Sequence, residues 1–130
     1  MAGLNHSMRI SASGMVAERF RMDVISTNIA NANSMKVGNQ MPYQRRIVQL
    51  TAGPDGVRIT GVIQDPREFR VEFDPGNPNA DAQGRVLYSN VRPIEEMVDM
   101  IGASRAYEAN IAAFNAARGM IRSALNIGKV

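Results

Sequence analysis

The two ends of the chain resemble each other in hydrophobic patterning, and the middle follows a different pattern. Residues 4–33 and 91–127 have the apolar spacing of long helices, whereas the residues between them alternate apolar and polar side chains and are interrupted by Gly, Pro, Asp and Asn. We expect an α+β fold in which long N- and C-terminal helices pair as a coiled-coil-like bundle, with a small antiparallel β-rich middle region.

Apolar residues of the N-terminal segment recur at alternate spacings of four and three. The series consists of Leu4, Met8, Ser11, Met15, Glu18, Met22, Ile25 and Ile29, in which the polar Ser11 and Glu18 interrupt the apolar residues. A period of about 3.5 residues is typical of a seam between packed helices. We expect this helix to run to about Asn31, where Asn28, Asn31 and Asn33 tolerate a left-handed C-terminal turn. An irregular connector is expected from Ser34 to Gln40.

The middle segment contains four runs with strand-like alternation, at residues 43–50, 57–63, 69–73 and 85–88. They predict one small antiparallel sheet, which would be only marginally stable alone. The loop at 74–84 carries oxygen-bearing side chains at every second position from Asn77 to Gln83, as calcium loops do. It lacks the glycine at the sixth position, and Tyr88 stands where the bidentate glutamate belongs. We therefore interpret it as a surface loop.

The C-terminal helix is expected to begin near Asn90, with Pro93 in its first turn. Glu95, Glu96 and Asp99 then stabilise the positive end of the helix dipole. Its apolar stripe comprises Met100, Ala103, Tyr107, Phe114, Ala117, Ile121 and Ala124, with Ile111 at the shoulder and Ile94, Met97, Val98 and Ile101 broadening the start. About 35 residues make roughly 50 Å of helix, which exceeds the ~25–30 Å diameter of a domain this size. Such a helix needs partners.

The residue types that carry most catalytic chemistry are scarce. Cysteine is absent and His6 is the only histidine, so disulfides, thiolate nucleophiles and histidine-based metal clusters cannot form within one chain. The glycines form no phosphate-binding pattern. We expect no catalytic residues, no cofactor and no metal, and we do not expect an enzyme.

The formal charge of +3 is spread evenly along the sequence, since residues 1–33, 34–90 and 91–130 each carry a net charge of +1. Nucleic-acid binding needs a concentrated basic stripe, and the only basic doublet is Arg45-Arg46, which we interpret as a solvated strand edge or a subunit contact. There is no apolar run long enough to span a membrane. No basic segment followed by an apolar one opens the sequence, so we expect no cleavable signal peptide.

Several segments together resemble the bacterial flagellar basal-body rod proteins, most closely the proximal-rod members. They are residues 11–14 with the asparagine-rich stretch 22–33, residues 42–46, residues 57–61, 65–66 and 73–81, and residues 95–101, 105–110 and 125–129. The resemblance covers nearly the whole chain. The connector from Ser34 to Met41 departs from the Thr/Gly-rich stretch expected in this family.

The resemblance implies a structural subunit of the proximal rod, which transmits torque as a drive shaft. Its partners would be other copies of itself, other flagellar rod proteins and the flagellar type III export apparatus, with no nucleic acid and no membrane span. The rod crosses the periplasm, and export would proceed without a cleavable signal peptide. Residues 1–33 and 91–130 would be assembly helices, and residues 34–90 a connector and small β-rich region.

We expect the assembly interface to lie on the two helices. The candidate residues are Leu4, Met8, Met15, Met22, Ile25, Asn28, Ile29, Asn31, Asn33, Ile94, Met97, Ile101, Arg105, Tyr107, Asn110, Ile111, Phe114, Ile121 and Leu125. The alternative is a monomeric helical-hairpin module that binds a partner protein through a methionine-rich groove. Limited proteolysis of the monomer distinguishes the two, because the module should protect both ends in dilute solution.

Overall fold

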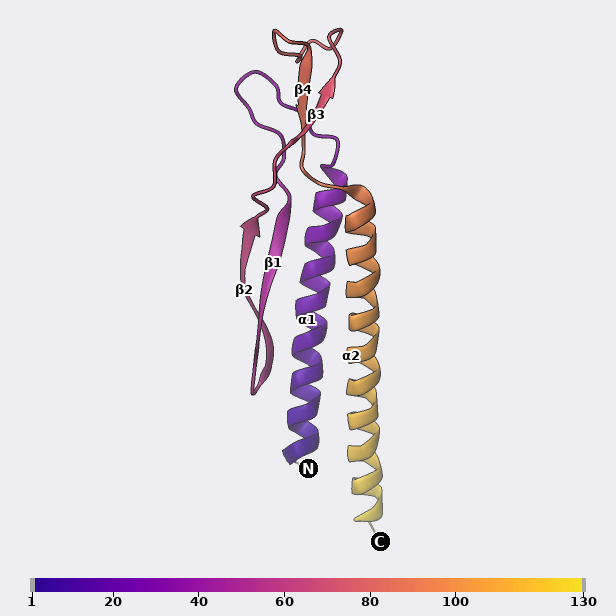
Figure 1. The fold of residues 1–130 in the computed structure, drawn as a ribbon. Helices are drawn as coiled ribbons and strands as arrows, with labels where there is room; N and C mark the ends of the chain where they lie inside the picture. Colours follow the sequence, from indigo (N-terminus) through magenta and orange to yellow (C-terminus); the bar gives the residue numbers. More distant parts are fainter. Residues whose placement is uncertain (1, 130) are drawn as a thin grey trace. The chain divides into compact units, whose positions relative to one another are not determined.

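A computed structural model describes residues 2–129, in which two long helices flank a β-rich middle in the sequence (Figure 1). The elements in order are α1 (Ala2–Ala30), β1 (Arg46–Gly53), β2 (Gly56–Gln64), β3 (Arg70–Phe73), β4 (Arg85–Tyr88) and α2 (Pro93–Ile127). This confirms the predicted α+β class. Neither helix in this part of the chain combines the length and apolar character needed to cross a bilayer.

The chain divides into two compact units. Among the described residues, unit 1 consists of 2–22, 48–61 and 100–129, and unit 2 consists of 23–47 and 62–99. Each helix therefore contributes one part to unit 1 and the remainder to unit 2. Within unit 1 the parts of α1 and α2 lie side by side and antiparallel, with the β1–β2 hairpin beside α1 (Figure 1).

The four-three series of α1 lies on the face that packs within the units. Ser11 and Ile25 are buried, and the other members are half-buried. The predicted stripe of α2 behaves in the same way, because Ala103 and Ala117 are buried while its Met, Tyr, Phe and Ile residues from Met100 to Ile121 are half-buried, Ile111 at its shoulder excepted. The two seams read from the sequence are thus the surfaces that the chain uses for its own packing.

The two units differ in the size of their buried apolar side chains. In unit 1 the buried apolar residues are all alanines, at positions 17, 103 and 117, whereas unit 2 buries Ile25, Val86 and Val91 together with Ala32. Burial of an alanine removes little apolar area from water, and it stabilises a fold much less than burial of an isoleucine or a valine. Unit 1 therefore has the thinner hydrophobic core.

The strands form two separate two-stranded sheets, β1–β2 and β3–β4, so the prediction of one sheet was wrong. In the second sheet, β3 runs antiparallel to β4 with Arg70 opposite Tyr88 and Phe73 opposite Arg85. The connector lies along the other edge of β4, where Lys36 N–H donates to Leu87 O (2.9 Å) and Ser89 N–H donates to Ser34 O (2.9 Å). This segment occupies the edge that a third strand would need.

α1 ends within one residue of the expected Asn31, but the turn after it and the start of α2 differ from expectation. α2 begins at Pro93, three residues later than Asn90, whose side chain serves another purpose described below. α1 ends at Ala30, and no residue other than glycine has a positive φ between residues 2 and 129. Instead of a left-handed turn, the Asn31 side chain donates to Thr27 O (2.8 Å) and satisfies one of the terminal carbonyls.

Candidate assembly interface

The predicted interface residues fall into three groups by burial. Ile25 and Asn28 are buried. The half-buried group comprises Leu4, Met8, Met15, Met22, Ile29, Asn31, Tyr107, Asn110, Phe114 and Ile121. The exposed group comprises Asn33, Ile94, Met97, Ile101, Arg105, Ile111 and Leu125. Of these groups, the exposed one is available to a neighbouring subunit without rearrangement of the chain.

In unit 1, Ser13 attaches the turn of the β1–β2 hairpin to α1. Its Oγ donates to Ile10 O (2.6 Å) and accepts from Val57 N–H (3.0 Å). Gly56 makes this approach possible, because its φ is +115° and a Cβ there would lie 2.2 Å from Ser13 Oγ. The small residues of the 11–14 segment are therefore explained by contacts within the chain.

Gly14 permits close packing of α1 against α2 in the same unit. A Cβ at this position would lie 2.6 Å from Asn110 Nδ2, which itself donates to Ala106 O (2.9 Å). The Asn110 amide thus fills the space that the missing side chain leaves. Asn110, predicted as an assembly residue, contacts its own α1.

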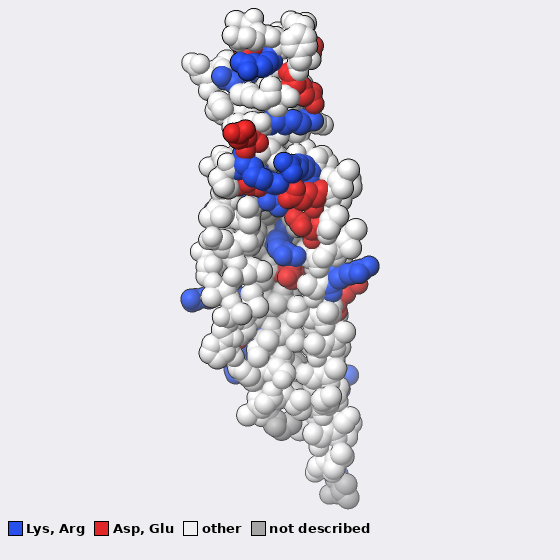
Figure 2. All heavy atoms as spheres, viewed as in Figure 1, with Lys and Arg blue, Asp and Glu red and all other residues white. Residues whose placement is uncertain are grey.

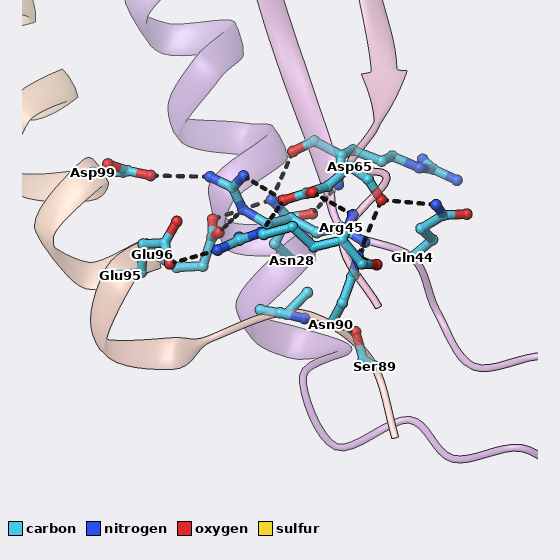
Figure 3. Close-up of polar contacts among 12 residues, drawn as sticks. Asn28, Gln44, Arg45, Asp65, Ser89, Asn90, Glu95, Glu96 and Asp99 are labelled. Atoms are coloured by element: carbon cyan, nitrogen blue, oxygen red, sulfur yellow. Dashed lines mark hydrogen bonds and ion pairs between the residues drawn. The ribbon is translucent and has the colours of Figure 1, made fainter. Parts of the chain in front are cut away.

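Unit 2 contains a dense polar cluster around Arg45 (Figure 3). We call it the Arg45 cluster, and it consists of Asn28, Arg45, Asp65, Arg67, Asn90, Glu95, Glu96 and Asp99. The Arg45 side chain is only 12% exposed and contacts three carboxylates. Its Nε pairs with the fully buried Glu96, its Nη1 lies 3.0 Å from Asp65 Oδ2 and its Nη2 lies 3.1 Å from Asp99 Oδ2.

Asp65 and Asn90 extend this cluster through backbone groups. Asp65 accepts from the backbone N–H of Arg67 (2.9 Å) and pairs with its Nε (2.8 Å), and Arg67 Nη1 reaches Glu95 Oε2 at 3.1 Å. The Asn90 amide donates to Asp65 O (3.1 Å) and Arg67 O (3.0 Å), while its Oδ1 accepts from Arg45 N–H (2.7 Å). Asn90 therefore joins the segments that precede β1 and follow β2.

Asn28 connects α1 to the cluster and uses its full hydrogen-bonding capacity. Its Nδ2 donates to Glu96 Oε2 (3.1 Å) and Arg46 O (2.9 Å), and its Oδ1 accepts from Tyr43 Oη (2.8 Å) and Arg46 N–H (3.0 Å). A buried amide that makes all four of its bonds is stabilising, and each bond left unmade would be costly. Asn28 thus links α1 to Tyr43, Arg46 and Glu96 within the subunit.

Electrostatic contacts in the cluster favour the charged forms of Arg45, Asp65, Arg67 and Glu95. Burial alone raises the pKa of the Asp65 carboxyl, but the Arg67 N–H and the guanidiniums of Arg45 and Arg67 lower it further than burial raises it. The hydrogen bond from Arg67 lowers the pKa of Glu95. Burial lowers the pKa of Arg45, and its carboxylate partners reverse that effect. These ion pairs are complete at neutral pH, so these carboxylates hold the fold together and are not poised to transfer protons.

The sequence indicates a solvated strand edge or a subunit contact for Arg45 with Arg46, the start of a helix for Asn90, and the helix dipole alone for Glu95, Glu96 and Asp99. Nothing in the sequence selects Asp65 or Arg67 as members of this cluster. One signal for Arg45 was present. Successive side chains of an extended segment point to opposite faces, so Arg45 and Arg46 cannot both lie on a solvated edge. Arg46 is exposed and Arg45 is not. The carboxylate partners follow from long-range folding and have no local signal.

Large apolar side chains project from the start of α2 in unit 2. Ile94 is 79% exposed, Met97 55% and Val98 63%, and their spacing of three and four residues puts them on one helix face. We call these three residues the α2 start patch. Arg92, Pro93 and Ile94 also line a shallow, mostly apolar depression beside it.

The end of α2, in unit 1, carries a second exposed set. Met120 is 58% exposed and Ile127 76%, and their spacing of seven residues puts them on one helix face. We call these two residues the α2 end patch. Leu125, which is 53% exposed, comes four residues after Ile121 and so lies on the side of the inward stripe. Exposed apolar residues that recur along one helix, while its inward stripe is already packed, are typical of surfaces that bind another protein.

Comparisons with known proteins identify the class to which this architecture belongs. The family model described as Flagella basal body rod protein matches residues 8–34. A second family model, described as Flagellar basal body rod FlgEFG protein C-terminal, matches residues 82–127. The two matches contain most of α1 and all of α2. Both point to flagellar rod proteins.

Relatives of full length narrow this class. The flagellar basal-body rod protein FlgC of Bacillus subtilis is 37% identical over 95% of this chain and 97% of its own length. The FlgC proteins of Aquifex aeolicus, 40% identical over 88% of this chain and 90% of the relative, and of Salmonella typhimurium, 35% identical over 92% and 94%, are similar too. The chain therefore belongs to the FlgC family of flagellar basal-body rod proteins.

Family membership confirms the resemblance drawn from the sequence. It makes this chain a structural protein of the flagellar basal-body rod and not an enzyme. The monomeric binding module is accordingly not favoured.

Proposed function

We propose that this subunit assembles into the rod through the exposed apolar faces of its terminal helices, against further copies of itself and other rod proteins. The observation that carries this proposal is that large apolar side chains are exposed along α2, from the α2 start patch through Ile101 and Ile111 to the α2 end patch. The inward stripe of the same helix is occupied by the chain itself. Any partner must therefore use the outer face.

The energetics of these faces favour many contacts over one strong contact. Full burial of a large aliphatic side chain contributes about 1.5–3 kcal/mol, and association of two proteins costs about 4–15 kcal/mol or more in lost freedom. A single patch of three side chains only approaches that cost. Because a rod subunit has neighbours on several sides, several such patches act together, and the load of torque is distributed among them.

The thin core of unit 1 suits a subunit that becomes fully ordered on assembly. Its buried apolar residues are alanines, and Ile101, Met120 and Ile127 are exposed on the outer face of its part of α2. Contacts with neighbours would supply the burial that the isolated unit lacks. A subunit that is loosely ordered in this region would pass more easily through a narrow export channel, which agrees with secretion by the flagellar type III apparatus without a cleavable signal peptide.

The roles proposed for the segments of the sequence are as follows. Residues 1–33 and 91–130 act as assembly helices. Residues 34–90 form the connector and the β-rich region, which lies outside the contacts between the helices of neighbouring subunits. The two compact units cut across these segments, because each unit takes part of both helices. The proposed division concerns roles in assembly, and the rod so formed would cross the periplasm.

The test is to place charge on the outer face of α2. We expect the Ile94→Asp/Val98→Asp double variant, and separately Ile111→Asp, to abolish motility and incorporation into basal bodies while the amount of soluble subunit stays normal. Ile94 and Val98 are 79% and 63% exposed, so their replacement leaves internal packing intact. Ile111 is only 36% exposed, so circular dichroism of its variant checks that the subunit still folds. Thr51→Asp, exposed on β1, is the matched control and should remain motile. Normal motility of both apolar-to-Asp variants would contradict the proposal.

A further inference from the structure

Strand β3 has a neighbour on only one of its two edges. The backbone N–H of Asp74, directly after β3, donates to Gly84 O (2.8 Å), directly before β4. Successive residues of an antiparallel strand direct their backbone groups to alternate sides, so Val71 and Phe73 direct their N–H and C=O groups away from β4. Among residues 2–129, no backbone or side-chain group is hydrogen-bonded to these outward groups. The outer edge of β3 is therefore free.

The side chains of this free edge are also exposed. Val71 is 53% exposed and Phe73 74%, although both are large and apolar. Arg70 and Glu72 lie on the other face of the strand, are each about half exposed, and form an ion pair of 3.0 Å between Nη1 and Oε1. A free strand edge with exposed apolar side chains is a template for pairing with the strand of another chain.

Charge selects the strand that fits this edge. Figure 2 shows acidic and basic side chains mixed over unit 2, so a contact made there must match charges. The segment Phe69–Phe73 reads Phe-Arg-Val-Glu-Phe, and its reversal keeps the apolar positions and exchanges the two charges. Antiparallel pairing of two copies about Val71 thus places each Arg70 opposite a Glu72. A centre at either neighbouring residue would instead place Arg70 or Glu72 opposite its own copy, which is destabilising.

We infer that β3 of one free subunit pairs antiparallel with β3 of a second copy of this chain, about a two-fold axis at Val71. Val71 exchanges both of its outward backbone hydrogen bonds with its counterpart, and each Arg70 lies within reach of the opposite Glu72. The next opposite pair would consist of the acidic Glu68 and Asp74, which lie outside β3 and confine the contact to this strand. So small a contact is weak and reversible.

This contact differs in kind from those that build a rod. A two-fold contact uses the same surface on both copies and closes as a dimer, whereas a rod continues from copy to copy. The β3 pair therefore belongs to the subunit before assembly, where it covers an edge that otherwise favours aggregation. The inference goes beyond the proposed function, because the contact involves neither helix.

Oxidative cross-linking of the purified full-length subunit tests this pair, since the chain has no native cysteine. Val71→Cys places the two thiols at the axis, where the Cα atoms of a hydrogen-bonded pair lie about 5.5 Å apart and a disulfide can form. Val62→Cys, at a 43% exposed position of β2, is the matched control. We expect disulfide dimers of Val71→Cys to form at least tenfold faster than those of Val62→Cys. Equal rates would overturn the inference.

Charge reversal in the Val71→Cys background tests the register. Arg70→Glu and Glu72→Arg each place like charges opposite one another, so each should slow dimer formation about fivefold or more. Arg70→Glu/Glu72→Arg restores both pairs of opposite charges and should recover the rate of Val71→Cys alone. A double variant no faster than either single variant would overturn the inference. Both side chains are about half exposed, and far-UV circular dichroism checks that each variant folds.

Sedimentation equilibrium of the chain without introduced cysteines measures the same contact independently. The inference predicts a dimer that forms reversibly as the subunit concentration is raised. Val71→Pro removes an N–H from the free edge and leaves the β3–β4 ladder intact, so it should weaken this dimer at least tenfold. No dimer at any soluble concentration, or a dimer that Val71→Pro leaves unchanged, would overturn the inference. Neither result affects the proposed function, whose failure appears as motility of the α2 variants.

Discussion

Asn28 and Glu96, 68 residues apart in the sequence, are joined by a 3.1 Å hydrogen bond from Asn28 Nδ2 to the buried Glu96 carboxylate. This bond ties the last turns of α1 to the first turn of α2 within unit 2. The same carboxylate pairs with Arg45, which in turn contacts Asp65 and Asp99. The start of α2, where the proposed docking surface lies, is thus held by a polar core.

Replacement of Asn28 should destabilise unit 2 strongly. Asn28→Ala removes the hydrogen bonds that Asn28 makes to Glu96 Oε2, to the Tyr43 hydroxyl and to the backbone of Arg46, and we expect a loss of about 3 kcal/mol or more in the free energy of unfolding. Asn28→Asp should cost more, because it places a second carboxylate beside Glu96. Urea denaturation followed by far-UV circular dichroism measures both. Asn33 is exposed, and Asn33→Asp is the matched control. Equal losses of stability from substitutions at the two positions would contradict the role of Asn28 in linking these segments.

Arg45 should be far less replaceable than its neighbour Arg46. Arg45→Met removes the guanidinium that pairs with the buried carboxylates of Asp65 and Glu96, and we expect a loss of about 3–5 kcal/mol in the free energy of unfolding. Arg45→Lys should recover only part of this, because one ammonium group cannot reproduce a guanidinium fork that serves three carboxylates. Arg46 is exposed and stacks over Tyr43, so Arg46→Met should cost less than about 1 kcal/mol. A larger effect at Arg46 than at Arg45 would contradict this assignment.

The stability of the subunit should fall in acid. The pKa values of Asp65 and Glu95 are lowered in the folded state, so their contribution is complete above the pKa of the unfolded chain and is lost as pH falls through the folded pKa. We therefore expect a level free energy of unfolding from pH 7 to about 5 and a decline below about pH 4. Asp65→Asn should make this decline shallower. Stability that rises on acidification would contradict the charged state of the cluster.

Two helical glycines should respond in opposite directions to substitution by alanine. A Cβ at Gly14 meets the Asn110 amide, so Gly14→Ala should destabilise unit 1 by about 1–3 kcal/mol. Gly119 has no atom within 4 Å of the same position, and Gly119→Ala should stabilise α2 by about 0.5–1 kcal/mol. The midpoint temperature of thermal unfolding, measured for each variant and for the wild type, shows both effects. Asn110→Ala should relieve the Gly14→Ala defect, and absence of rescue would show that the close approach lies elsewhere.

The helices and their inward faces could be predicted from the sequence because they have local causes. The four-three spacing from Leu4 to Ile29 identified the packed face of α1, and the alternation around Phe73 and Val86 identified strands. Strand pairing was not predictable in this way, because alternation marks a strand without naming its neighbour. The connector that occupies the edge of β4 through Lys36 and Ser89 has no periodic pattern at all.

The polar core was the least predictable part. Asn90 is a residue type that often caps a helix, and Glu95 and Glu96 are residue types that stabilise the start of a helix dipole. These local roles explain why such residues stand here, but they do not predict the long-range contacts that the residues make. Their partners Arg45, Asp65 and Arg67 are distant in the sequence, and only folding brings them together. The exposed apolar patches of α2 were predictable only in part. The candidate interface residues include Ile94 and Met97 of the α2 start patch but not Val98, and they include neither Met120 nor Ile127 of the α2 end patch.

The central claim is that assembly covers the outer face of α2, and Met97 and Met120 report on that face directly. Both residues are more than half exposed in the subunit. Mild peroxide oxidation followed by peptide mass spectrometry gives their rates in the purified subunit and in isolated rods. We predict that both rates fall at least tenfold in rods. Equal oxidation of Met97 and Met120 in the free and assembled states would contradict the account.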